Sequence, residues 1–183
     1  MRVLGLAGSL RRDSHNLRLL RGAATLLPSD AELVVFDQLG AIPLYNEDEE
    51  ADAPVAVQAL RHAVAEADAL LIATPEYNGS IPGVLKNAID WVSRPVASSP
   101  LKGKPVAVIG ASTGLFGAVW AQAETRKVLG IVGSDVIDRE LPIGQADEAL
   151  RADGLPLDSD AVEHLAATLD ELIEHAQPRR VAA

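Results

Sequence analysis

Three short apolar runs restrict the fold more than any other feature of the chain. They lie at residues 3–7, 33–36 and 69–73. A strand that is apolar at nearly every position is buried on both faces, which is typical of parallel sheets covered by helices on either side. The runs therefore favour an α/β fold over an architecture in which one face of the sheet meets water.

Segments with helical spacing alternate with these runs. Apolar residues recur three and four positions apart at 17–27, 55–67, 81–92, 116–129 and 158–176, and further strands are predicted at 105–110 and 136–141. Five strands alternating with five helices predict a flavodoxin-like, doubly wound, five-stranded parallel sheet of order 2-1-3-4-5 with helices on both faces. A chain of 183 residues suits a single domain, which we expect at 1–176, followed by a short C-terminal tail at 177–183.

Charge and cysteine content exclude several classes of function. Sixteen Lys and Arg residues against 26 Asp and Glu residues leave a net charge of −10, which repels nucleic acid and anionic membranes. The absence of cysteine excludes disulfides, thiolate metal sites and cysteine nucleophiles, and the four scattered histidines predict no metal site. No stretch reaches the roughly 18 apolar residues of a membrane span. We expect a soluble cytoplasmic protein with no nucleic-acid or membrane partner.

Ligands of doubly wound sheets bind beyond the carboxyl ends of the strands, at the point where the strand order reverses. The loops after strands one, three and four should therefore meet in space. In this chain they are residues 8–16, 74–82 and 111–114, and they carry its most unusual sequence. We expect the functional site there.

The first of these loops has the composition of a phosphate site. Hydroxyl, amide and guanidinium groups crowd the start of a helix, whose free N–H groups and dipole favour anions. Neither of the glycine patterns that bind pyrophosphate or triphosphate is present, so a single terminal phosphate fits better. A structural alternative is that Ser14 or Asn16 caps the helix, and we expect Arg12 and His15 to be solvent-exposed. The candidate phosphate ligands are Ser9, Arg11, Ser14 and Asn16.

The second loop suits a flat ligand. Pro75 and Pro82 stiffen its ends, and Gly79 permits close approach of the backbone to a ring. Tyr77 can lie against that ring. A compatible structural interpretation makes Ser80 the N-cap of the next helix, with Pro82 in its first turn.

The third loop supplies small residues, Ser112, Thr113 and Gly114, whose backbone N–H groups are accessible to the carbonyl oxygens of a ring. Small residues follow many strands, so this composition alone indicates little. Its position after the fourth strand is what makes it a candidate.

Together these motifs resemble a known family. Two motifs resemble those of the NADPH-dependent FMN reductases, a family of flavodoxin-like proteins. The first is Gly8-Ser9-Leu10-Arg11 followed by Ser14 and Asn16, and the second is Pro75-Glu76-Tyr77-Asn78-Gly79-Ser80-Ile81-Pro82-Gly83 continuing to Trp91. The resemblance extends from residue 1 to about residue 160. In the third loop it is looser, because one glycine stands where many relatives carry two.

The resemblance implies one noncovalent FMN per subunit, which NADPH or NADH reduces and which passes electrons to quinones, free flavins, azo compounds or metal oxyanions. It places the phosphate at Ser9, Arg11, Ser14 and Asn16, the ring against Pro75, Glu76, Tyr77, Asn78 and Gly79, and the far edge of the ring near Ser112 and Gly114. Because the cofactors carry the reaction, we expect no catalytic side chain.

Two other functions are compatible with parts of the sequence. A nonenzymatic flavodoxin-like electron carrier fits the size and acidity, although the arginine in the phosphate loop argues against it. A dinucleotide-binding dehydrogenase fits Gly5, Gly8 and Asp37, but Arg11 occupies the place of the third glycine.

The resemblance also implies homodimers or homotetramers with the flavin near the interface. Trp91 and Trp120, the two tryptophans, fall on helices beside the proposed site, where either a subunit contact or core packing would account for them. Arg126 is similar to an inter-subunit arginine of the relatives.

Overall fold

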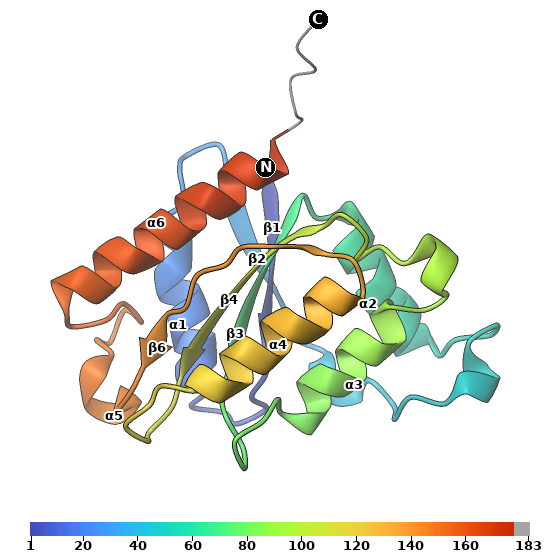
Figure 1. Cartoon of the computed structure of the whole chain (residues 1–183), viewed down its shortest axis with the longest axis horizontal. Helices are drawn as coiled ribbons and strands as arrows, with labels where there is room; N and C mark the ends of the chain where they lie inside the picture. Colours follow the sequence, from blue (N-terminus) through green and yellow to red (C-terminus); the bar gives the residue numbers. More distant parts are fainter. Residues whose placement is uncertain (178–183) are drawn as a thin grey trace, which may run out of the picture.

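A single parallel sheet organises the protein (Figure 1). The computed structural model describes residues 1–177. The sheet contains β1 (Arg2–Ala7), β2 (Glu32–Phe36), β3 (Ala69–Thr74), β4 (Pro105–Ala111) and β5 (Asp135–Val136), in the order β2-β1-β3-β4-β5. All neighbouring strands run parallel. The predicted flavodoxin-like fold and strand order are confirmed.

The fifth strand differs from the prediction of a continuous strand at 136–141. Two short strands, β5 and β6 (Pro142–Ile143), pair separately with the beginning and the end of β4. Between them lie Asp138, whose side chain is fully exposed, and Glu140, whose side chain is about half exposed. A charged segment cannot stay in the buried middle of the ladder without losing its hydration, so the chain leaves the sheet there and returns.

Helices cover both faces of the sheet, as predicted. On one face lie α1 (His15–Ala24) and α6 (Ser159–Ala176), and on the other lie α2 (Val55–Glu66), α3 (Gly83–Val92) and α4 (Val119–Ile131) (Figure 1). The described residues also contain a short helix, α5 (Ala146–Ala149), which the sequence analysis did not predict.

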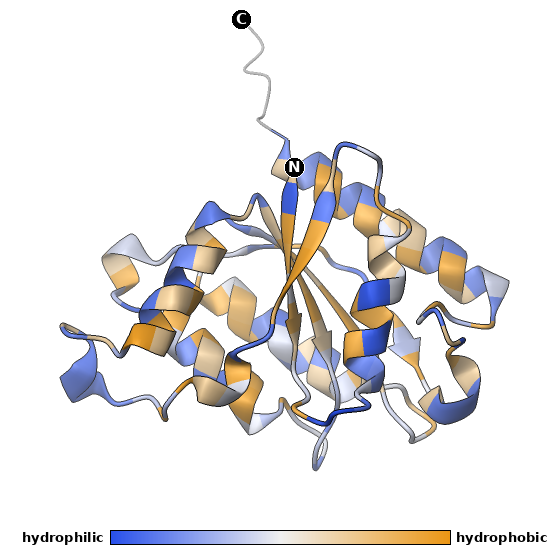
Figure 2. Ribbon diagram, turned by 180° about the vertical axis from the view of Figure 1, so that it is seen from behind, coloured by the Kyte–Doolittle hydropathy of each residue, from blue (hydrophilic) through white to orange (hydrophobic). Residues whose placement is uncertain are grey.

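Alternate residues of the strands face the two cores. In β3, Leu70 and Ile72 pack with α2 and α3, whereas Leu71 packs with α1 and α6. All three side chains are 1% exposed or less. The strands are accordingly hydrophobic while the helices alternate in colour around their axes (Figure 2). This two-sided burial is the physical origin of the apolar runs in the sequence.

The helix α4 begins three residues later than its apolar spacing predicts. Gly117 and Ala118 adopt positive φ angles of 59° and 62°, which no α-helix contains. A Cβ atom on Gly117 would lie 2.4 Å from the carbonyl carbon of Pro142, so the close approach of β6 requires glycine there.

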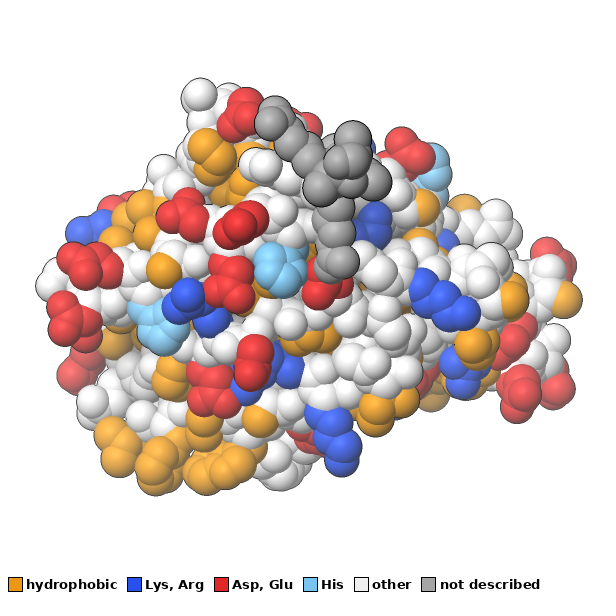
Figure 3. All heavy atoms as spheres, turned by 45° about the horizontal axis from the view of Figure 1, so that its top comes forward, with side chains coloured by type: hydrophobic (Ala, Val, Ile, Leu, Met, Phe, Trp, Pro, Cys, Tyr) orange, Lys and Arg blue, Asp and Glu red, His pale blue; other side chains and the backbone are white. Residues whose placement is uncertain are grey.

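Charged groups are dispersed over the face of the molecule that Figure 3 shows. In the view of Figure 3, acidic, basic and histidine side chains are interspersed, and the basic ones form no continuous patch on that face. Among the described helices, none has the length and apolarity needed to cross a membrane. The tail expected at 177–183 lies, apart from its first residue, outside the described residues.

Two helical glycines provide a test of this packing. A Cβ atom on Gly22 of α1 would lie 2.5 Å from the carbonyl carbon of Gly154, whereas Gly130 of α4 faces open space. We expect Gly22→Ala to lower the free energy of unfolding by about 2–3 kcal/mol because backbone must move. We expect Gly130→Ala to leave it unchanged or raise it by up to about 1 kcal/mol. Urea denaturation measures both, and equal effects would contradict the packing of α1 on the 154–155 segment.

Candidate functional site

The register of the central strands brings three loops to one edge of the sheet. Ala7 pairs with Ala73, and Thr74 pairs with Gly110, so β1, β3 and β4 end at nearly the same level. The backbone N–H of Gly8 donates to the carbonyl of Ala73 at 2.9 Å. A Cβ atom on Gly8 would lie 3.0 Å from Pro75 Cδ, so the glycine lets the first two loops approach each other closely.

A cavity of about 180 Å³ lies where these loops meet. Seven of the predicted cofactor-binding residues line it, together with three residues that were not among them. The predicted ones are Ser9, Arg11, Asn16, Pro75, Glu76, Tyr77 and Ser112, and the others are His15, Ala111 and Thr113. Four predicted residues do not line this cavity: Ser14, Asn78, Gly79 and Gly114. The structure thus unites residues from all three loops.

Two polar residues of the first loop are committed to the fold. Ser14 is the N-cap of α1, and its Oγ accepts a hydrogen bond from Leu17 N at 3.2 Å, as the structural alternative predicts. Asn16 does not cap. Its side-chain amide donates to Ala111 O at 2.8 Å and its Oδ1 accepts from Ala111 N at 2.9 Å, with 2% of the residue exposed. Asn16 therefore fastens the start of α1 to the end of β4.

Arg11 is the basic group at this cavity. Its Nε donates to the carbonyl of Asp13 at 3.1 Å, and it takes part in none of the ion pairs among the described residues. Arg12 is exposed, as expected. The expectation that His15 is solvent-exposed is wrong, because only 9% of this residue is accessible. Its Nε2 lies 3.0 Å from Asp147 of α5, a helix that the sequence pattern did not reveal.

The second loop forms a tight turn. Tyr77 and Ser80 exchange backbone hydrogen bonds of 3.3 and 3.2 Å, and Asn78 and Gly79 between them have positive φ angles of 55° and 72°. An Asn-Gly pair is favoured in a two-residue turn with this backbone. Asn78 and Gly79 thus form the tip of the loop, and Tyr77 is half exposed beside it.

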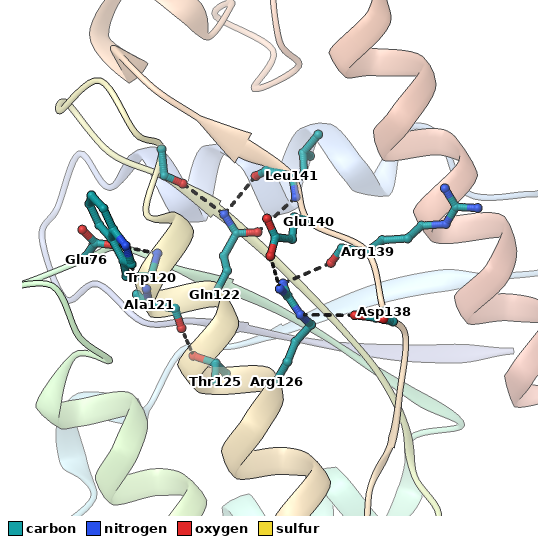
Figure 4. A network of polar contacts seen from close by, with 11 residues as sticks. Glu76, Trp120, Ala121, Gln122, Thr125, Arg126, Asp138, Arg139, Glu140 and Leu141 are labelled. Carbon is teal, nitrogen blue, oxygen red and sulfur yellow. Dashed lines mark hydrogen bonds and ion pairs between the residues drawn. The ribbon is translucent and has the colours of Figure 1, made fainter.

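Two carboxylates tie this loop to α4. Glu76 Oε2 accepts from the backbone N–H groups of Trp120 and Ala121 at 3.0 and 3.1 Å, at the start of the helix (Figure 4). A carboxylate there satisfies free helix donors and faces the positive end of the helix dipole. Ser80 Oγ donates to Glu124 Oε2 at 2.6 Å.

The structure corrects the predicted role of Ser80 as an N-cap. The helix α3 begins at Gly83, and Pro82 is in the capping position without a side-chain hydrogen bond. The contact of Ser80 with Glu124 spans 44 residues, so no local pattern in the sequence indicates it.

Buried Gln122 supports the third loop, which in the structure extends from Ser112 to Ala118. Its Nε2 donates to Gly117 O at 3.0 Å, and its Oε1 accepts from Leu141 N at 3.1 Å (Figure 4). The third loop is thereby joined to the segment before β6. An isolated glutamine in a helix gives no sequence signal for such a role.

Arg126 is bound within its own chain. Its guanidinium donates to the carbonyl of Arg139 at 3.2 Å and forms an ion pair with Glu140, and only 11% of its side chain is exposed (Figure 4). These contacts within the chain occupy the guanidinium. A contact of Arg126 with another subunit stays a prediction. In residues 1–177, no group of three or more His, Asp or Glu side chains is arranged to hold a metal ion.

A family model and several relatives match this architecture. The model of the NADPH-dependent FMN reductases matches residues 1–148. The chain belongs to this family. A 2-hydroxy-1,4-benzoquinone reductase from Burkholderia sp. is 39% identical over 182 residues, covering 99% of each chain. An NAD(P)H-dependent FMN reductase from Pseudomonas aeruginosa is 44% identical over 174 residues, covering 94% of this chain and 93% of the relative.

A solved structure agrees with the family assignment. The flavoenzyme NAD(P)H:(acceptor) oxidoreductase FerB from Paracoccus denitrificans superimposes with a TM-score of 0.83 at 38% identity, with 96% of each chain covered. The family, the oxidoreductase class and the use of FMN with NAD(P)H are thus confirmed. Membership of a reductase family disfavours both the nonenzymatic carrier and the dinucleotide-binding dehydrogenase.

The Asn16 contact leads to a stability prediction. Asn16→Ala removes two buried hydrogen bonds and leaves both backbone groups of Ala111 without a partner. We expect the free energy of unfolding to fall by about 2–4 kcal/mol, because buried unpaired groups lose hydration without compensation. The control Asn46→Ala removes an exposed amide whose two hydrogen bonds, with Asp48 N and Glu49 Oε1, lie at the surface, and it should cost about 1 kcal/mol or less. Urea denaturation of the flavin-free protein compares them, and equal losses would show that the contact of Asn16 with Ala111 is dispensable.

Proposed function

We propose that the chain is an FMN-dependent NAD(P)H:quinone oxidoreductase whose site is the cavity between the three loops. The observation that carries this proposal is that Arg11, without a carboxylate partner among the described residues, lines a cavity shared by all three loops. An FMN molecule offers the matching groups, an anionic phosphate and a flat ring. Bound FMN would supply the two-electron chemistry between nicotinamide and acceptor.

In this proposal the first loop binds the phosphate. Arg11 offers a planar fork of donors suited to phosphate oxygens, and Ser9 adds a hydroxyl at the same cavity. Ser14 and Asn16, which the resemblance also assigns to the phosphate, are already committed through their side chains to Leu17 and Ala111. We propose that they hold the shape of the loop, with backbone N–H groups and spare amide donors left for the ligand.

The second and third loops bind the ring in this proposal. Pro75 to Gly79 would form one wall, and Ser112 and Gly114 would lie near the far edge. The first turn of α3 begins directly after the second loop, and its dipole favours negative charge that develops beside it. No side chain needs to exchange a proton with substrate, so we assign no catalytic residue.

The open shape of the site suits a permissive second substrate. Its volume of about 180 Å³ is below the roughly 300–1,000 Å³ of enclosed small-molecule sites, so part of a bound ring would face solvent. A planar acceptor can therefore approach after the nicotinamide leaves. The relatives named as quinone reductases favour quinones as acceptors. Free flavins, azo compounds and metal oxyanions are further candidates, and the cytoplasmic location stays a prediction.

Anaerobic reduction tests this function. We expect the protein, reconstituted with FMN and washed, to retain the flavin absorption band and to lose it rapidly when NADPH or NADH is added. With a quinone as acceptor, double-reciprocal plots should be parallel, because the two substrates use the same site in turn. A retained band that neither nucleotide bleaches would instead support an electron carrier.

Two adjacent arginines provide the control for the phosphate site. Arg11→Ala should weaken FMN binding by about tenfold or more, because a charge-assisted contact is lost, and should leave riboflavin binding unchanged. Arg12→Ala makes the same change in net charge at an exposed position and should have little effect. Equal effects of the two variants would mean that Arg11 is not a specific phosphate ligand.

We further propose that the protein is a homodimer or homotetramer in which α4 contributes to the contact. Phe116, three residues before α4, and Trp120, in its first turn, are 57% and 52% exposed, and their rings meet edge to face at 5.1 Å. Large aromatic side chains gathered on a surface are typical of interfaces. Trp91, by contrast, is fully buried and belongs to the core.

A charge placed in this aromatic pair should disrupt the contact. We expect Trp120→Glu to shift the protein toward the monomer in light scattering coupled to size-exclusion chromatography. The control is Leu157→Glu, which charges an apolar side chain of similar exposure (63%) before α6 and should leave the mass unchanged. An unchanged mass for Trp120→Glu would place the contact elsewhere.

A further inference from the structure

The short helix α5 lies against the third loop. Gln145 N donates to Gly114 O and Ala146 N donates to Ser112 O, both at 3.0 Å, and Ala146 is fully buried. These contacts place the next residue, Asp147, beside the first loop. An acidic side chain therefore stands next to a site that is proposed to bind an anion.

His15 separates this acid from the guanidinium of the site. Its Nε2 lies 3.0 Å from Asp147 Oδ1 and also 3.0 Å from Arg11 Nη2. Arg11 and Asp147 form no ion pair with each other in the described chain, although both contact the same nitrogen. The imidazole occupies the space in which they would otherwise meet.

The position of the imidazole proton follows from its surroundings. His15 Nδ1 is buried and has no hydrogen-bond partner among residues 1–177, so a proton there would be an unsatisfied buried donor. The neutral ring is therefore best protonated on Nε2, from which it donates to Asp147. A nitrogen that donates cannot accept from Arg11 as well. The guanidinium then keeps the carbonyl of Asp13 as its acceptor and has donors free for an anion.

Asp147 is able to compete with such an anion. Its side chain is 67% exposed, so it is free to turn once it is not held. Its Oδ1 is within about 6 Å of Arg11 Nη2, because each lies 3.0 Å from the same nitrogen. An unrestrained carboxylate at this separation attracts the guanidinium.

We propose that His15 is a positioning residue that holds Asp147 away from Arg11 and so keeps the guanidinium available to the phosphate of FMN. This role rests on the proposed function. It gives His15, which lines the same cavity, an effect on phosphate binding that acts through Asp147. Changes at His15 or Asp147 should therefore alter the affinity for FMN and not that for riboflavin, which lacks the phosphate.

The test compares dissociation constants of FMN and riboflavin for the flavin-free full chain, measured at low salt by quenching of flavin fluorescence. His15→Phe retains a ring but cannot hydrogen-bond to Asp147. We expect it to raise the FMN dissociation constant about three- to fivefold, the strength of an exposed competing ion pair, and to leave that of riboflavin unchanged. His15→Gln, whose amide can still donate to Asp147, should behave like the wild type.

Second-site variants separate this role from a loss of structure. Asp147→Asn, combined with His15→Phe, should restore FMN binding because the competing charge is gone. Glu148→Gln removes the same charge from the neighbouring exposed residue and should not restore it.

Several outcomes would overturn the assignment. Equal weakening of both flavins in His15→Phe would show that His15 only supports the loop, and a failed rescue by Asp147→Asn would exclude the competition. If the wild-type chain bound neither flavin, the proposed function itself would fail and this role with it. Intact wild-type binding of FMN without the rescue would remove the role of His15 alone.

Discussion

Parallel hydrogen bonding among β1, β3 and β4 is the constraint on which the rest of the structure depends. Because the three strands pair in register, they end at one level, and Gly8, Pro75 and Ser112 begin their loops at the same edge. Burial of both faces of these strands requires apolar side chains throughout, so polar chemistry is displaced to the loops. The same constraint that builds the core therefore also gathers the site.

The loops are held in place by side chains that reach across the edge. Asn16 binds both backbone groups of Ala111, Glu76 caps α4, and Gln122 joins the third loop to the segment before β6. Such contacts satisfy backbone groups that no strand or helix can satisfy at these positions. Residues near a ligand site thus divide into those that hold the loops and those, such as Arg11 and Tyr77, whose polar or aromatic groups are left for a ligand.

Much of the fold could be predicted because it depends on local patterns. The apolar runs locate β1 to β4, and the helical spacing locates α1 to α4 and α6. A strand buried on both faces is apolar at nearly every position, whereas a helix buried on one face has apolar residues three and four positions apart. The topological rule for these sheets predicted that the three loops meet at one edge. The seven predicted residues that line the cavity there came from the composition of the loops together with the resemblance to the family. The division of the last strand into β5 and β6 was missed, because a short apolar segment with charged residues is compatible with either arrangement.

The sequence by itself determined the class of fold, the three loops and the family, because hydrophobic period and contiguous motifs are properties of the linear chain. Only the tertiary structure decided what individual polar side chains do. Ser80 binds Glu124 instead of capping α3, and His15 is buried between Arg11 and Asp147. These roles depend on partners 44 and 132 residues away, and the free energy of a buried polar group is set by which partner folding brings to it.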